Sequence, residues 1–231
     1  MLRLFLAAAL LASSGAVAAD KAASSYPALP KGITSFGAVE CDGFIYVYGG
    51  HSGKAHTYSN ETNLGTFHRL PVGGGTSWEE LLGGTRLQGL NLTTTDGKIY
   101  RVGGMEARNK AGEKGDLHST AEVAVYDPKE KKWSAGVPMP AGRSSHDVVA
   151  VGSKLVVVGG WEMKGADKPV WADTVLIFNT KGESRMWREV KQPFKRRSLT
   201  VAALGTKVYV IGGLTEAGES VRTVKIGRAH V

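Results

Sequence analysis

The sequence predicts an all-β fold built from repeated sheets, and three observations lead to this prediction. A short run of β-forming residues that ends in a pair of glycines occurs four times. Successive pairs lie roughly 55 residues apart, a spacing typical of a structural repeat. Glycine is frequent, with 31 of the 231 residues against only 8 prolines, which suits many tight turns between short strands. The pairs are Gly49-Gly50, Gly103-Gly104, Gly159-Gly160 and Gly212-Gly213.

Each glycine-ended run has further elements in step with it. A small polar turn precedes each run, as at Asp42-Gly43, and favours a hairpin. Downstream, a second β-forming run carries an aromatic residue and is followed by a tryptophan. These are Tyr126 with Trp133, and Phe178 with Trp187. The first repeat matches this part poorly, so Tyr58 and Phe67 are expected to take the place of its aromatics. Residues 78–82 are expected to form one helical turn in a loop.

Together these elements resemble the kelch repeat, and the resemblance spans residues 32–224. It implies that each repeat is a four-stranded blade of a β-propeller, with the glycine pair closing the second strand. It also implies that Tyr126, Trp133, Phe178 and Trp187 pack between blades. The chain holds about three and a half four-stranded blades on this count, so we expect a partial, truncated propeller.

The ends of the chain predict separate segments. Residues 1–18 combine Arg3, an apolar run and a small-residue cleavage pattern, which predicts a signal peptide rather than a buried helix. The mature protein is therefore expected to be secreted or periplasmic, with a linker at residues 19–31 and the propeller at residues 32–225. The start of a widely used sequencing adapter can encode residues 226–231, so we expect a non-native tail there; the alternative is a true C-terminus.

Composition and motifs argue against several functions. The formal net charge is +8, but the basic residues are scattered, so a nucleic-acid-binding face is not expected. No later segment approaches the length of a membrane span. Cys41 is the single cysteine and is expected to be a buried small residue. No dinucleotide-binding or nucleophile-elbow motif occurs, and the histidines lack a tight metal spacing. We therefore predict no cofactor and no metal, and no catalytic residue can be assigned.

Candidate ligand residues lie in loops of one face, which is where the resemblance implies that ligands meet the propeller. Arginines recur before the first strand of several repeats and could bind carboxylates or sulfates; alternatively, they bond loop carbonyls. The residues after the glycine pairs differ between repeats, which favours an asymmetric ligand surface. Tryptophans there could stack on a ligand, and two glutamates could supply acid or base groups or be solvated charges. The candidates are Arg86, Arg143, Arg196, His51, Glu106, Trp161, Glu162 and Trp171.

The sequence leads to three hypotheses for function. The first is a non-catalytic module that binds a protein, a glycan or a small anionic ligand. The second, by resemblance in outline to periplasmic kelch sialate mutarotases, is an enzyme acting on an acidic sugar. The third, by resemblance to copper radical oxidases with a kelch-like propeller, is a galactose-oxidase-like enzyme, although its ligand motifs are not recognisable here.

Overall fold

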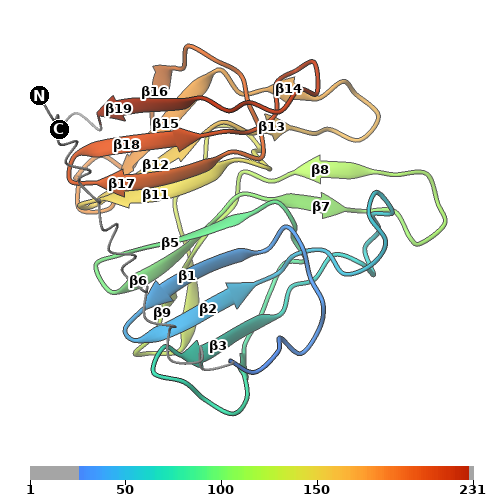
Figure 1. Cartoon of the computed structure of the whole chain (residues 1–231), viewed down its shortest axis with the longest axis vertical. Helices are drawn as coiled ribbons and strands as arrows, with labels where there is room; N and C mark the ends of the chain where they lie inside the picture. Colours follow the sequence, from blue (N-terminus) through green and yellow to red (C-terminus); the bar gives the residue numbers. More distant parts are fainter. Residues whose placement is uncertain (1–25, 229–231) are drawn as a thin grey trace, which may run out of the picture.

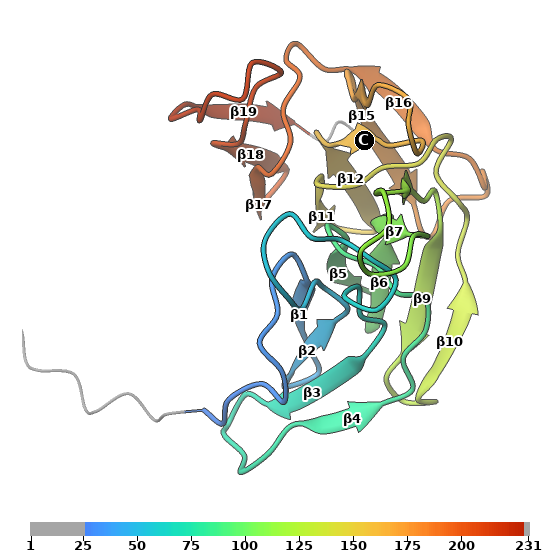
Figure 2. The ribbon, with the colours of Figure 1, turned by 90° about the vertical axis from the view of Figure 1, so that its right-hand side faces the viewer.

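The computed structural model describes residues 26–228, and its regular elements are all β-strands. Three four-stranded antiparallel sheets and one three-stranded sheet follow one another along an arc, here named blades 1 to 4 (Figures 1 and 2). This confirms the prediction of about three and a half blades. The signal peptide predicted at residues 1–18 lies outside the described residues.

Each blade runs from an inner first strand to an outer last strand in chain order. Blade 1 comprises β1 (Gly37–Cys41), β2 (Phe44–Tyr48), β3 (Phe67–Pro71) and β4 (Glu79–Leu81). Blade 2 comprises β5 (Asn91–Thr95), β6 (Lys98–Val102), β9 (Val123–Asp127) and β10 (Lys132–Ala135). Blade 3 comprises β11 (Asp147–Val151), β12 (Lys154–Val158), β15 (Thr174–Asn179) and β16 (Arg188–Lys191). Blade 4 comprises β17 (Thr200–Leu204), β18 (Lys207–Ile211) and β19 (Val224–Arg228).

Two small hairpins extend blades 2 and 3 beyond their second strands. They are β7 (Met105–Ala107) with β8 (Leu117–Ser119), and β13 (Trp161–Glu162) with β14 (Val170–Trp171). Both project from the same end of the sheets, on the right in Figure 1. We call this end the loop face.

The structure differs from the sequence prediction in two strands. Glu79–Leu81 forms the outer strand β4 of blade 1, where we expected a helical turn, because it pairs with β3. β19 extends to Arg228 and so includes the first three residues of the expected non-native tail. Backbone pairing is open to any residue except proline, so this strand leaves the origin of the tail a prediction.

A chain of backbone hydrogen bonds joins the blades near their inner edge. Ser35, Gly89, Ser145 and Ser198 precede the four inner strands, and each has a positive φ. The N–H groups of the last three each donate to the carbonyl of the one before, at 2.7, 2.8 and 2.7 Å. This axial chain holds the loop-face ends of the inner strands in fixed relative positions.

The glycine pairs make the second repeated connection between blades. The N–H groups of Gly50, Gly104 and Gly160 donate to the residues that enter the next blade, at 2.8, 2.9 and 2.7 Å. At Gly159, φ is 69° and an added Cβ would lie 2.6 Å from the carbonyl oxygen of Arg196, which enters blade 4. Glycine is required there because a side chain would separate the two blades.

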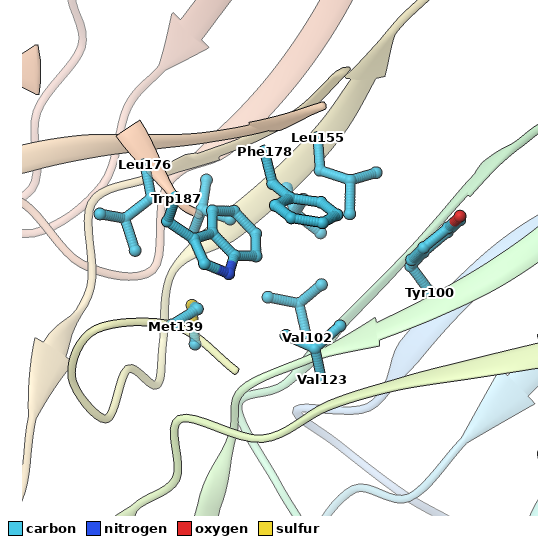
Figure 3. Close-up of a cluster of buried hydrophobic side chains, with 10 residues drawn as sticks. Tyr100, Val102, Val123, Met139, Leu155, Leu176, Phe178 and Trp187 are labelled. Carbon is cyan, nitrogen blue, oxygen red and sulfur yellow. The ribbon is translucent and has the colours of Figure 1, made fainter. Parts of the chain in front are cut away.

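Aromatic side chains fill the wedge between successive blades. Between blades 2 and 3, Phe178 and Trp187 lie 5.1 Å apart by ring centroids and pack with Leu155, Val102 and Met139 (Figure 3). The indole N–H of Trp187 donates to Val137 O at 3.0 Å. The buried indole thus gains both apolar contacts and a partner for its one polar group.

Blade 1 has its own tryptophan in this place. Arg69 pairs with Glu79, so Trp78 stands opposite Leu70 on the outer edge of the blade. Trp78, Trp133 and Trp187 donate their indole N–H groups to Pro27, Leu82 and Val137, respectively, at 3.0, 2.9 and 3.0 Å. The expectation that Tyr58 serves in blade 1 was wrong, because Tyr58 lies in a loop; Phe67 is buried between blades 1 and 2.

Candidate functional site

A cavity of about 250 Å³ opens on the loop face at the inner ends of the blades. We call it the axial pocket. The axial chain forms its floor, and side chains from the loops of blades 1 to 4 form its walls. Its lining residues are Ser35, His56, Tyr58, Gln88, Gly89, Met105, Leu117, Ser145, Trp161, Met163, Arg197 and Ser198.

Apart from histidine, Arg197 is the one charged residue that lines the axial pocket. Its guanidinium packs on the ring of Trp161. The Arg197 Cζ lies 4.3 Å from the Trp161 ring centroid, within the range of a cation–π contact. Trp161 in turn meets Trp171 edge to face at 5.4 Å, and this pair closes the β13–β14 hairpin. Arg197 Nη1 lies 3.4 Å from Ser198 Oγ, and its buried Nε has no hydrogen-bond partner among residues 26–228. The Arg197 guanidinium is therefore held in place by Trp161, while its Nε lacks a hydrogen-bond partner.

Tyr58 and His56 form the opposite wall of the axial pocket. Tyr58 contacts His51 edge to face at 5.0 Å, and the His51 ring lies 3.3 Å from Thr57 O. His51 is only 3% exposed and is absent from the pocket lining. This candidate from the sequence therefore supports Tyr58 from behind rather than facing a ligand.

Glu106 and Glu162 do not line the axial pocket. Successive residues of a strand point to opposite sides, so each glutamate faces away from its pocket-lining neighbour, Met105 or Trp161. Glu162 forms an ion pair with Lys164 at 3.0 Å and accepts a hydrogen bond from the Gly142 N–H. Glu106 lies 3.6 Å from Arg108. This placement fits solvated loop charges, which was the alternative to acid or base groups.

Arg143 and Arg196 are buried and donate to oxygens at or next to the ends of strands in their own blades. Arg143 donates to Thr174 O and Oγ1 at 2.9 and 3.1 Å, and burial lowers its pKa to about 10. Arg196 donates to Gly212 O and Thr223 Oγ1 at 3.3 and 3.0 Å. Both arginines thus bond protein oxygens, which was the alternative to ligand binding, and neither lines the axial pocket.

Arg86 is not the counterpart of these two arginines. Leu87 is, because its carbonyl accepts the glycine-pair N–H as those of Arg143 and Arg196 do. Arg86 is exposed and donates to Asn60 O and Oδ1, both at 3.0 Å. The position that faces the pocket is one residue later in the repeat, at Gln88 and Arg197.

Sequence reasoning missed Arg197, because it selected the adjacent Arg196. The available signal was the pair of adjacent arginines, because only one of two neighbours can point into the interface between blades. It also missed Ser145 and Ser198, whose positive φ is set by the axial chain. Cys41 is buried as expected, and burial raises the pKa of its thiol.

Comparisons with known proteins agree with this architecture. No family model matches the chain. It is 26% identical over 170 residues to Kelch-like protein 35 of Mus musculus, covering 74% of this chain and 25% of that protein. It is 25% identical over 134 residues to Beta-scruin of Limulus polyphemus, covering 58% of this chain and 14% of that protein. The chain thus spans a quarter or less of these curated relatives.

Among solved structures, that of YjhT superposes with a TM-score of 0.67 and 16% identity, covering 89% of this chain and 67% of that one. The fold is therefore that of a β-propeller, here present as an arc of blades. The repeat elements and these sequence relatives show that the blades of this arc are of the kelch type.

Residues 26–228 contain no helix that is long and apolar enough to cross a membrane. No cluster of three or more His, Cys, Asp or Glu side chains there could hold a metal ion.

Proposed function

We propose that this chain is an exported, non-catalytic binding module that recognises an anionic group of a partner protein or small ligand at the axial pocket. The observation that carries the proposal is Arg197, held on the Trp161 ring beside a cavity of about 250 Å³ with a buried, unpartnered Nε. A guanidinium presents its N–H donors in a fixed plane that suits a carboxylate.

The scaffold around Arg197 favours binding over a wide face. A kelch propeller is a rigid support, and its loops commonly carry interactions with other proteins. Tyr58 and Trp161 supply aromatic surface on two sides of the axial pocket, as is typical of binding hot spots. The apolar Met105 and Met163 give the pocket a surface that adapts to the shape of a ligand.

The experiment is a binding screen of the whole chain against an array of peptides that carry aspartate or glutamate. The matched probes are the same peptides with asparagine or glutamine. We expect Arg197→Ala to reduce binding of the acidic peptides at least tenfold and to remove their preference over the amides. The control is Arg185→Ala, which removes an exposed arginine outside the axial pocket. Equal loss in both variants would show that net charge alone drives binding.

A second candidate is an enzyme acting on an acidic sugar, and the hydroxyls in the axial pocket favour it. Ser145 and Ser198 lie beside Arg197 and could bond sugar hydroxyls while the guanidinium binds a carboxylate. The test follows the anomers of N-acetylneuraminic acid by NMR with the whole chain present. Faster exchange that Arg197→Ala abolishes would favour this enzyme, whereas an unchanged exchange rate would count against it.

A further inference from the structure

A second cavity, of about 390 Å³, lies on the loop face next to the axial pocket. We call it the side cavity. Its two walls are the loop between β2 and β3, at residues 56–62, and the tip of the β7–β8 hairpin, at residues 111–117. Both walls belong to blades 1 and 2, which are complete four-stranded sheets, so the side cavity does not depend on blade 4. Three of its lining residues, His56, Tyr58 and Leu117, also line the axial pocket.

Hydrogen bonds between the two walls fix the shape of the side cavity. The Asn60 N–H donates to Asn109 O at 2.9 Å, and the buried side chain of Asn109 donates to Tyr58 O at 2.9 Å. The Ala111 N–H donates to the Glu61 carboxylate at 3.0 Å. The side cavity is therefore preformed, and a ligand would not have to order these loops when it binds.

The side cavity and the axial pocket carry opposite charges. Apart from histidine, the charged residue that lines the axial pocket is Arg197, whereas the one that lines the side cavity is Glu113. Glu113 Oε2 accepts the Lys110 N–H at 2.7 Å, which holds the carboxylate in a turn at the tip of the hairpin. Lys110 and Lys114 flank Glu113 in the sequence, but neither lines the side cavity. A lysine or arginine side chain of a ligand would complement this charge.

The wall that the two cavities share sets the distance between them. Tyr58 belongs to this wall, and its ring contacts His51 and His56 edge to face at 5.0 and 6.2 Å. The cavities are therefore separated by the thickness of about one side chain. This spacing suits alternate side chains of an extended peptide, which point the same way and lie about 7 Å apart. Two ligand side chains on either side of Tyr58 would thus come from residues two places apart.

We propose that the ligand is an extended peptide of a partner protein, in which an acidic residue binds Arg197 and a basic residue two places along the peptide enters the side cavity beside Glu113. This inference rests on the proposed function, because it takes Arg197 as the anion site. The axial pocket then supplies affinity for the acidic residue, and the side cavity selects among acidic peptides by the position of the basic residue. Opposite charges at a fixed spacing also set the register of the bound peptide.

The probes are short dye-labelled peptides of glycine and serine around a central triplet, and binding to the whole chain is measured by fluorescence anisotropy. We expect Glu-Gly-Lys to bind about fivefold more tightly than Glu-Gly-Gln, which is the effect of one exposed ion pair. The charge-matched control is Glu-Lys-Gly, in which the lysine points to the opposite side of the peptide, so it should bind no more tightly than Glu-Gly-Gln. Equal affinities for Glu-Gly-Lys and Glu-Lys-Gly overturn the inference.

Protein variants then locate the site of the basic residue. Glu113→Gln keeps an oxygen that accepts the Lys110 N–H but removes the charge, so it should bring the affinities for Glu-Gly-Lys and Glu-Gly-Gln within twofold of each other. The matched control is Glu130→Gln, which changes an exposed glutamate outside both cavities and should keep the preference for lysine. An unchanged preference in Glu113→Gln overturns the inference.

The same measurements separate this inference from the proposed function. If the lysine adds nothing while Arg197→Ala still weakens both acidic peptides at least tenfold, the peptide inference fails and the anion site at Arg197 stands. If neither acidic peptide binds the wild-type chain, the proposed function fails as well.

Discussion

Trp187→Ala tests whether aromatic filling between blades stabilises the arc. The side chain of Trp187 is 9% exposed, packs on Phe178 at 5.1 Å and donates to Val137 O at 3.0 Å. Truncation of a buried tryptophan costs about 3–5 kcal/mol through lost burial and the cavity left behind. The unpaired Val137 carbonyl adds about 1 kcal/mol. We therefore expect a loss of about 5 kcal/mol in the free energy of unfolding, measured by urea denaturation with circular dichroism.

Two companion variants separate the contributions. Trp187→Phe keeps an aromatic ring but removes the indole N–H, so it should cost about 1–2 kcal/mol. Trp171→Ala removes a half-buried tryptophan of the loop face and should cost about 1 kcal/mol, the worth of its aromatic contacts. A Trp187→Ala loss no larger than that of Trp171→Ala would refute the reasoning, because the wedge would then be filled without the indole.

Three further outcomes are expected. Gly159→Ala should cost more than about 2 kcal/mol in urea denaturation because its Cβ would lie 2.6 Å from the carbonyl oxygen of Arg196, which enters the next blade, whereas Gly218→Ala, with open space at a similar φ, should cost about 1 kcal/mol. Burial raises the pKa of Asp147 to about 6, so the fold favours its protonated form and the stability that this group contributes declines as pH rises from about 4 through 6. The shift of about 2 pKa units corresponds to about 3 kcal/mol, so the stability difference between the wild type and Asp147→Asn should change by this much between pH 4 and 7; a constant difference would contradict it. Burial, with a smaller contribution from Arg143, lowers the pKa of His146 to about 3. Its imidazole should therefore show no protonation by NMR from pH 8 down to pH 5. Titration near pH 6.5 would contradict this, because it would mean that water reaches the ring.

The sequence determined the strands and the repeat, because both depend on short-range patterns. Four glycine pairs with preceding turns were enough to predict the second strand of every blade. The aromatic–tryptophan pattern likewise predicted the third and outer strands of blades 2 and 3. Blade 1 escaped this reading because its third strand has Leu70 in place of the aromatic, which hid the role of Trp78.

The site depended on tertiary structure, because a shift of one residue reverses which way a side chain points. Arg196 and Arg197 are neighbours in the sequence, yet Arg196 is buried against Gly212 and Thr223 while Arg197 lies on Trp161 at the axial pocket. The axial chain decides between them, because the Ser198 N–H donates to Ser145 O of the preceding blade and so sets the turn that follows Arg197. Local sequence therefore decided what forms strands here, and the packing of one blade on the next decided which side chains face a ligand.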